Sequence, residues 1–401
     1  MITDWDARRK ETYREIQKSY AEHLLRGTTD MADNHMEVSA FDYTCSKRFE
    51  QEKVALFQNT PLLAALSVDL PGKGDRVVFE DAGPSILIVR NQDNDVKAFL
   101  NMCMHRGAKL EHECKKSKLI KCPFHAWSYD LNGDIAAIPG EEGFENIDVK
   151  TKSLISVPCA EWNGFIFVTA NPNAPAIDVE AFLGDFAPEL LQLEVHRAEP
   201  VKSGVMTADT NWKYALDTYG ESYHFAALHP ETVFKLNMSN VGVFRGFGYH
   251  HRLNFPEHTA HDWVALPEAE WPEETFGAVH FLFPNTVIFF GSLSEGVSFL
   301  QIFRLFPGES VGKLKTQFAV YAPLGIESEE QRASVEMLGY DMTAHVVLTE
   351  DYKMASDSWA RLKDAPDGFK LTFGANEPAL QNTHKAFAEV MSLHKTEQPH
   401  E

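Results

Sequence analysis

The sequence predicts an α+β protein with two folded parts of different character. Short apolar runs of the β type, such as residues 85–89 and 96–100, follow one another from about residue 76 and are separated by polar turns. Asn132-Gly133 lies between two further runs and is typical of a β-hairpin turn. Beyond the turn-rich segment 171–175, helical and strand spacings are mixed. We therefore expect a small all-β domain followed by a larger mixed domain.

The individual elements follow from the same patterns. Apolar residues at helical spacing predict a helix near the N-terminus that stops at Gly27, and residues 48–65 suggest a second one. In the mixed part we expect helices near 178–195, 209–228, 327–347 and 376–394, and strands near 276–305 and 314–322. The predicted organisation is a helical segment over residues 1–40, an all-β domain over 41–170 and a mixed domain over 171–401.

Composition and charge restrict the class of protein. The 401 residues include 37 basic and 58 acidic side chains, a net charge of −21, which argues against nucleic acid or an anionic membrane as a partner. The N-terminus lacks the basic start and apolar run of a signal peptide, and no apolar run is long enough to span a membrane. We expect a cytoplasmic protein. Its five cysteines suggest metal ligands or buried side chains rather than a disulfide framework.

The most specific motif has two halves. Cys103-Met104-His105 supplies one thiolate and one imidazole, and Cys122-Pro123-Phe124-His125 supplies another of each. Two facing β-loops can bring such halves together across residues 106–121. A Rieske 2Fe-2S cluster needs this set, because two cysteines hold one iron and two histidines hold the other. The four ligands predicted for the cluster are Cys103, His105, Cys122 and His125.

A zinc site is the competing interpretation. Zinc also binds two cysteines and two histidines, and His112 and Cys114 lie between the halves as additional ligands. Zinc motifs usually pair Cys with Cys, whereas each half here contains one Cys and one His. The flanking Arg106-Gly107 and Pro123-Phe124 also favour the cluster, and the two halves resemble the cluster-binding loops of the Rieske domain family. We interpret His112 and Cys114 as loop residues.

A second group of candidate ligands lies near residue 220. Two histidines and one carboxylate on one face form the facial triad of non-haem iron(II) enzymes. His224 and His229 would point roughly 140° apart on a regular helix, so the helix must loosen or end before His229 for both to bind one metal. Pro230 disfavours helical geometry at His229. Glu221 and His224, three residues apart, would share a helix face.

With the cluster motif upstream, this segment resembles the iron-binding stretch of the α subunit of Rieske non-haem iron oxygenases, the aromatic-ring-hydroxylating family. The resemblance implies that His224 and His229 bind the iron. It also implies that Glu221 connects an iron-ligand histidine to a cluster histidine of the neighbouring subunit, although many members have Asp there. The Glu350-Asp351 pair resembles the family pair whose Asp binds iron, which makes Asp351 the expected third ligand. The alternatives are the acids Glu350, Asp341 and Asp357.

The resemblance also implies the fold, the cofactors and the partners. We expect a Rieske domain at 41–170 and, at 171–401, a catalytic domain with a helix-flanked antiparallel sheet of the helix-grip, START-like type. Each chain would hold one 2Fe-2S cluster and one mononuclear Fe(II). Electrons would come from NADH or NADPH through a reductase, with or without a ferredoxin, because the chain has no dinucleotide fingerprint of its own. The implied assembly is a homotrimer, and the presence of a β subunit is left open.

Three functions are compatible with these residues. The first is dioxygen-dependent hydroxylation of a hydrophobic aromatic or alicyclic molecule, for which the aromatic segment 281–290 could line a pocket or form plain core. The second is a monooxygenase or demethylase for a quaternary amine, because Glu at the position of Glu221 also occurs in family members acting on such compounds. The third, from a different class, is a Rieske electron carrier without oxygenase activity.

Overall fold

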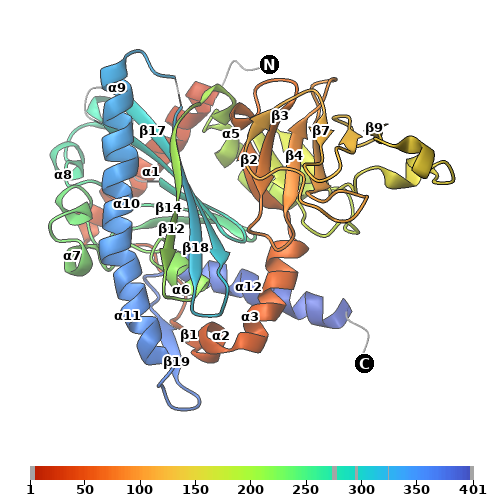
Figure 1. Cartoon of the computed structure of the whole chain (residues 1–401). Coiled ribbons are helices and arrows are strands. Elements are labelled where there is room, and N and C mark those ends of the chain that lie inside the picture. The colour runs from red at the N-terminus through yellow and green to blue at the C-terminus, as the bar shows by residue number, and fades with distance from the viewer. Residues whose placement is uncertain (1–4, 273–277, 294–296, 324, 398–401) are drawn as a thin grey trace. The chain divides into compact units, whose positions relative to one another are not determined.

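The structure is a computed structural model that describes residues 5–272, 278–293, 297–323 and 325–397 (Figure 1). The chain forms two compact units. One is Glu52–Phe182, and the other combines Met1–Gln51 with Leu183–Glu401. The domain boundaries predicted after residues 40 and 170 stay predictions, because compactness alone does not define a functional domain.

The unit Glu52–Phe182 is built from strands, which confirms the expected all-β character of this part. Its strands pair in antiparallel sheets of order β5-β4-β3-β6, β10-β11-β2 and β7-β8-β9. Their bounds are β2 (Leu62–Leu66), β3 (Asp75–Phe79), β4 (Ile86–Arg90), β5 (Val96–Leu100), β6 (Lys115–Lys116), β7 (Ile120–Lys121), β8 (Ser128–Tyr129), β9 (Ile135–Ala137), β10 (Cys159–Trp162) and β11 (Phe165–Val168).

The helix predicted over residues 48–65 is wrong in its second half. Helix α3 (Ser46–Glu52) continues as a π-helical turn over Lys53–Gln58, and the chain then enters β2, which pairs with β11. All five residues of β2 are buried. A short run that is apolar on both faces fits a buried strand as well as a helix, so periodicity could not distinguish them.

The second unit contains a seven-stranded antiparallel sheet of order β12-β18-β17-β16-β15-β14-β13. The strands are β12 (Glu199–Ala208), β13 (Val243–Phe247), β14 (His250–Asn254), β15 (Ala278–Leu282), β16 (Thr286–Leu293), β17 (Val297–Pro307) and β18 (Leu314–Ala322). The last four confirm the predicted strand regions, apart from residues 276–277 and 294–296, which lie outside the described residues. Strands β12, β13 and β14 were not expected, because they lack continuous apolar runs.

Long helices flank this sheet, as predicted for the catalytic domain. A helical stretch runs from α9 (Glu329–Ser334) through α10 (Thr343–Val346) to α11 (Tyr352–Leu362), with π-helical turns at Val335–Met342 and Val347–Asp351. It crosses one face of the sheet and contacts β12, β17 and β18 (Figure 1). The C-terminal helix α12 (Pro378–Glu397) contacts β13 and β14.

The N-terminal segment is tied to this second unit. Helix α1 (Trp5–Arg26) contacts β13, and β1 (Met36–Ser39) pairs with β19 (Lys370–Phe373). The Tyr43 hydroxyl donates a hydrogen bond of 2.7 Å to Asp217, and His384 of α12 contacts the other oxygen of the same carboxylate at 2.8 Å. Residues far apart in the sequence therefore support the helix that precedes Glu221.

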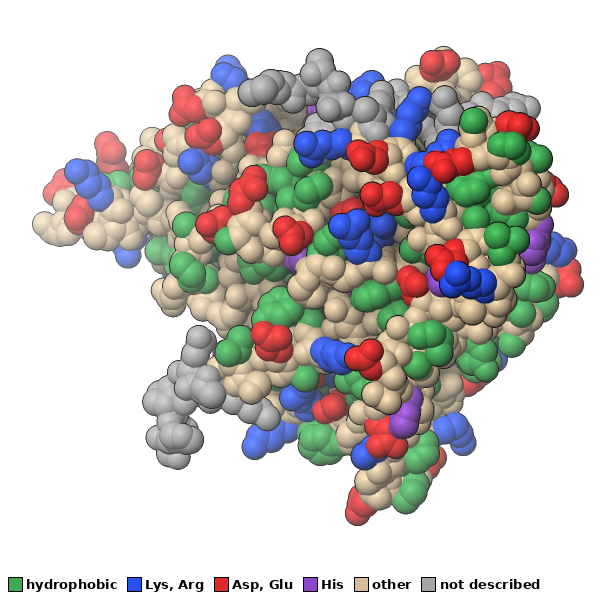
Figure 2. Space-filling view, turned by 180° about the vertical axis from the view of Figure 1, so that it is seen from behind, with side chains coloured by type: hydrophobic (Ala, Val, Ile, Leu, Met, Phe, Trp, Pro, Cys, Tyr) green, Lys and Arg blue, Asp and Glu red, His purple; other side chains and the backbone are tan. Residues whose placement is uncertain are grey.

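Two surface properties bear on the partners. None of the described helices has the length and apolar character needed to cross a bilayer. On the face shown in Figure 2, acidic and basic side chains are interspersed, with hydrophobic side chains in scattered groups between them. On that face the net charge of −21 is not gathered into one patch.

Candidate metal centres

The two predicted cluster loops have the same local geometry. In the first loop the N–H of Gly107 bonds the carbonyl oxygen of Cys103 at 2.8 Å, and in the second the N–H of Ala126 bonds that of Cys122 at 3.1 Å. Gly107 and Ala126, each four residues after the cysteine, both have positive φ, at 75° and 60°. This conformation turns the chain sharply and favours glycine, although Ala126 adopts it in the second loop. Each loop thereby presents its cysteine and histidine together.

The four side chains fit a two-iron cluster. Cys103 and Cys122 are buried in the hydrophobic core of the unit, and the His105 and His125 Nδ1 atoms are buried without a hydrogen-bond partner. Such nitrogens are costly unless they bind something, and a metal ligand atom needs no hydrogen. Among the described residues, only a different set gathers three or more ligand atoms within 4.8 Å. The wider spacing of these four side chains disfavours a single zinc ion.

Aromatic and polar neighbours surround the predicted cluster ligands. The indole of Trp127 stacks on the His105 ring with a centroid distance of 4.8 Å and an interplanar angle of 7°, and Phe144 contacts both rings edge-on. The Tyr129 hydroxyl lies 3.2 Å from Cys103 Sγ and accepts a hydrogen bond of 2.9 Å from the Met104 N–H. Burial raises the pKa of Cys103, and the hydrogen bond from Tyr129 lowers it. Tyr129 was not among the predicted site residues, because it lies outside both motif halves.

The remaining candidates of this region lie at the surface. His112 and Cys114 are exposed. The outward nitrogen of His125, Nε2, lies 2.7 Å from an Arg106 guanidinium nitrogen, and that guanidinium also covers the exposed Phe124 ring. The family resemblance connects Glu221 to one of the cluster histidines of a neighbouring subunit, a role that stays a prediction.

The helix near residue 220 is interrupted, as the spacing of the two histidines requires. Helix α6 (Trp212–Asp217) begins after Asn211, whose side chain accepts the Lys213 N–H. A turn follows, and the short helix α7 (Phe225–Leu228) ends just before His229, whose φ of −113° and ψ of 38° are not helical. Glu221 lies in the turn, so its contact with His224 comes from the turn and not from a shared helix face.

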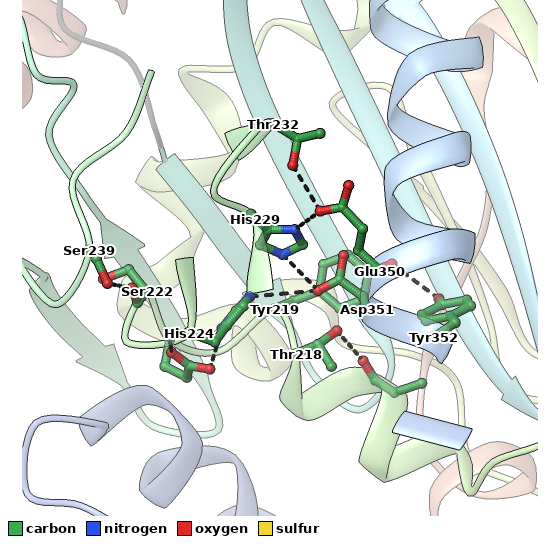
Figure 3. Close-up of polar contacts among 12 residues, drawn as sticks. Thr218, Tyr219, Ser222, His224, His229, Thr232, Ser239, Glu350, Asp351 and Tyr352 are labelled. Carbon is green, nitrogen blue, oxygen red and sulfur yellow. Dashed lines mark hydrogen bonds and ion pairs between the residues drawn. The ribbon is translucent and has the colours of Figure 1, made fainter. Parts of the chain in front are cut away.

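The structure brings His224, His229 and Asp351 together (Figure 3). Asp351 Oδ1 lies 3.2 Å from His229 Nε2 and 3.6 Å from His224 Nε2, and one ligand atom of each residue lies within 4.8 Å of the others. Metal bonds of about 2.1 Å at right angles place neighbouring ligand atoms roughly 3 Å apart. The His229 and Asp351 side chains are 2% and 10% exposed. The arrangement fits an octahedral ion held on one face.

The electrostatics of this site favour positive charge. Burial lowers the pKa of His224, but hydrogen bonds with Asp351 and Glu221 outweigh burial and raise it to about 9. For Asp351, burial raises the pKa, whereas hydrogen bonds from His224 and His229 hold it below its ordinary value. A divalent cation bound by these three side chains would supply the positive charge that the site favours.

The alternative carboxylates lie elsewhere. Asp341 pairs with Lys202 at 2.9 Å, and Asp357 pairs with Lys353 at 2.7 Å. Glu350 contacts His229, but at Nδ1, the nitrogen turned away from Asp351 (Figure 3). The structure therefore favours Asp351 as the third ligand among the acids considered.

Further acids lie close to Glu221. The Glu221 carboxylate contacts His224 Nδ1 and accepts the His224 backbone N–H. Burial raises the pKa of Glu377, and the negative charges of Glu221 and Asp217 raise it further. Together with Glu350 and Asp351, Glu221 surrounds the two histidines with carboxylates.

Comparison with known proteins agrees with both centres. Residues 60–154 match the Rieske [2Fe-2S] domain, and residues 194–393 match the ring hydroxylating alpha subunit (catalytic domain). The Escherichia coli (strain K12) carnitine monooxygenase oxygenase subunit is 34% identical over 191 residues, which cover 47% of this chain and 50% of that protein. The terephthalate 1,2-dioxygenase terminal oxygenase component subunit alpha 2 of Comamonas sp is 27% identical over 306 residues, covering 72% and 73%.

Solved structures show the same fold. The quaternary ammonium Rieske monooxygenase CntA superposes with a TM-score of 0.75 at 21% identity, over 90% of this chain and 96% of that chain. In sequence, this chain spans about half the length of the carnitine monooxygenase subunits it matches. With a Rieske domain and a ring-hydroxylating catalytic domain in one polypeptide, the chain belongs to the α subunits of the Rieske non-haem iron oxygenases.

Proposed function

We propose that this chain is the oxygenase component of a Rieske monooxygenase that hydroxylates a quaternary amine. The observation that carries the proposal is a largely buried triad of His224, His229 and Asp351, with further carboxylates against both of its histidines. The similarity to a carnitine monooxygenase subunit supports the same substrate class. The aromatic or alicyclic substrate, which was the first expectation from the sequence, becomes the second candidate.

The residues define what each cofactor would do. Bound at Cys103, His105, Cys122 and His125, a 2Fe-2S cluster would supply single electrons, and an iron(II) at His224, His229 and Asp351 would supply dioxygen activation. The triad occupies one face of the metal site and leaves the other face for dioxygen and substrate. Inserting one oxygen atom into a C–H bond consumes two electrons and two protons and reduces the other oxygen to water.

The charge around the triad supports a cationic substrate over an anionic one. Three carboxylates contact the two histidines, those of Glu221, Glu350 and Asp351. An iron(II) with neutral imidazoles would offset only two of these three charges. The remaining negative potential attracts a cationic substrate and repels an anionic one. Aromatic rings next to the histidines, such as Phe225 with a centroid 5.0 Å from that of His224, suit a cation as well.

A specific feature favours the second candidate, a hydrophobic substrate. A small cavity next to Gly220 is lined mainly by apolar side chains, including Leu216, Val279, Phe281 and Val287. Apolar walls suit an aromatic or alicyclic ring. Apolar walls do not distinguish a cationic substrate from a neutral one, whereas the carboxylates do. The experiment therefore varies the charge of the substrate.

The decisive experiment compares two substrates of the same shape. Dioxygen uptake and product formation are measured with a surrogate reductase, using glycine betaine and its uncharged-carbon analogue 3,3-dimethylbutyrate. We expect turnover with quaternary amines such as glycine betaine or carnitine, and loss of turnover with the analogue. Preference for the analogue, or for neutral aromatic compounds in the same screen, would contradict the proposal and support the second candidate.

An electron carrier without oxygenase activity would lack the mononuclear iron. Iron analysis after gentle purification should give about three iron atoms per chain, of which about one is lost in His224→Ala. Two iron atoms in both proteins would contradict an oxygenase. The proposed electron donor is a separate NAD(P)H-dependent reductase, with or without a ferredoxin.

We also propose that the chain works as a homotrimer, with or without a β subunit. In that assembly Glu221 would connect His224 to a cluster histidine of a neighbouring subunit, and the electron would pass from that cluster to the iron along this path. Light scattering of the purified protein measures the mass, and a monomer that is fully active would exclude this path.

A further inference from the structure

The imidazole of His229 is held at both of its nitrogens by consecutive residues. Glu350 Oε2 lies 2.5 Å from His229 Nδ1, and Asp351 Oδ1 lies 3.2 Å from Nε2 (Figure 3). The ring is 2% exposed, so water competes little for either nitrogen. The carboxylates of two consecutive residues thus contact opposite nitrogens of one imidazole ring.

The chemistry of these contacts fixes the protonation pattern of the ring. An ionised carboxylate can only accept hydrogen bonds, so Nδ1 must carry the hydrogen that points to Glu350. The Nε2 hydrogen bonds Asp351, and a metal that replaced this hydrogen would meet the Nε2 lone pair of a neutral ring. The Thr232 hydroxyl donates a hydrogen bond of 2.8 Å to the same Glu350 oxygen. That second bond fixes the position of the carboxylate.

The backbone explains how adjacent residues reach both sides of the ring. On a regular α-helix, consecutive side chains diverge by about 100°. Glu350 and Asp351 lie at the end of the π-helical turn Val347–Asp351, where the chain is locally wider. Such turns occur often at functional sites. The Asp351 side chain is 10% exposed, whereas the Glu350 side chain is 24% exposed.

His224 has an equivalent partner. Glu221 contacts His224 Nδ1, while His224 Nε2 lies 3.6 Å from Asp351. Each histidine therefore has a carboxylate behind it and Asp351 in front. The two carboxylates differ in origin, since Glu221 lies near the histidines in the sequence and Glu350 comes from the long helical stretch.

We propose that Glu350 is a positioning residue for the mononuclear iron site, and that it acts by fixing the tautomer and orientation of His229. The proposal deepens the proposed function and rests on the triad binding iron. It assigns Glu350 a place behind a ligand and not a place on the metal. Carboxylates behind a metal-binding histidine typically contribute 10- to 100-fold to metal affinity.

The test measures Fe(II) affinity by anaerobic titration of protein whose cluster is intact but whose mononuclear iron has been removed. Glu350→Gln should weaken Fe(II) binding by about 10- to 100-fold. Glu350→Asp keeps the charge and should recover part of that loss. Thr232→Val should weaken binding less than Glu350→Gln does, because it only loosens the carboxylate. The matched control is Glu336→Gln, since Glu336 lies on the same helical stretch and pairs with Lys202.

A second readout separates positioning from mere stability. Near-infrared magnetic circular dichroism of the bound Fe(II) reports its ligand field, which Glu350→Gln should alter while the cluster absorption stays unchanged. Equal Fe(II) affinity and spectra in Glu350→Gln and Glu336→Gln would overturn the proposal. Complete loss of the site, as severe as in Asp351→Asn, would also overturn it, because Glu350 would then be a ligand. Failure of the wild-type protein to bind Fe(II) would instead reject the proposed function.

Discussion

Asp351 Oδ1 lies 3.2 Å from the Nε2 atom of His229, although 122 residues separate the two in the sequence. The contact joins the end of a π-helical turn to the residue that follows helix α7. This contact brings Asp351 to the two histidines and completes the triad.

Replacing Asp351 by Asn should remove the mononuclear iron and leave the cluster in place. The amide has no charge to offset the metal, and the two histidines alone provide too few ligands. Iron content should fall from about three to about two atoms per chain, with an unchanged cluster spectrum. Asp341→Asn and Asp357→Asn serve as controls, since both acids are exposed and paired with lysines. If either control loses the iron instead, the third ligand has been assigned incorrectly.

Tyr129→Phe should lower the reduction potential of the cluster. The hydroxyl donates to the Cys103 sulfur once that sulfur is a thiolate, and this bond stabilises the more negative, reduced cluster. A hydrogen bond worth about 1 kcal/mol corresponds to about 40 mV for one electron. Spectroelectrochemical titration measures the shift. A higher or unchanged potential would show that the hydroxyl does not act on the cluster.

Glu221→Gln should slow electron transfer even when added Fe(II) keeps the mononuclear site filled. The amide keeps the shape of the side chain but removes the charge next to His224. Single-turnover oxidation of the reduced cluster, with substrate and dioxygen present, should become about 10- to 100-fold slower. Iron analysis on the same sample controls for metal loss. An oxidation rate equal to that of the wild type would exclude Glu221 from the path.

Glu189→Gln should reduce stability in a pH-dependent way. Burial raises the pKa of Glu189, but His280 and Arg252 outweigh burial and lower it from 4.5 to about 2. Because the folded-state pKa lies below the ordinary value, this stabilisation is present above pH 4.5 and is lost as the pH falls towards 2. It amounts to about 3 kcal/mol in the free energy of unfolding.

Denaturant unfolding at several pH values tests this expectation. The wild type and Glu189→Gln should differ by about 3–5 kcal/mol at neutral pH, because the variant leaves the Arg252 guanidinium buried without its partner at 2.6 Å. The difference should shrink below pH 4.5. Glu231→Gln is the control, since Glu231 is exposed and pairs with Lys235 within its own turn. A difference independent of pH would show that the ionisation of Glu189 is not the cause.

The cluster ligands were predictable because each half of the motif is contiguous and its residue types match one cofactor. The break before His229 was predictable too, since it follows from a spacing of five residues and from Pro230. The spacing of residues along the sequence could not identify the third ligand, and only the family resemblance indicated Asp351. Strand β12 was missed because polar and charged residues interrupt its apolar positions, and β2 was misread because it is apolar on both faces. The pairing of Glu350 with His229 depends on a π-helical turn that has no sequence signature.

The second unit is built from two separate segments of the chain, which has a practical consequence. Residues 52–182 are inserted into the second unit, which needs the segments before and after the insertion. The two segments contact each other, since β1 pairs with β19 and Tyr43 bonds Asp217. Expressing the chain from residue 183 onwards would strip away those partners and expose the apolar surface they cover. A separate catalytic half would instead require excising the inserted segment and rejoining the two flanks with a linker. Single-cut truncations of this polypeptide should therefore be insoluble or misfolded, which limits how its two electron-transfer centres can be studied apart.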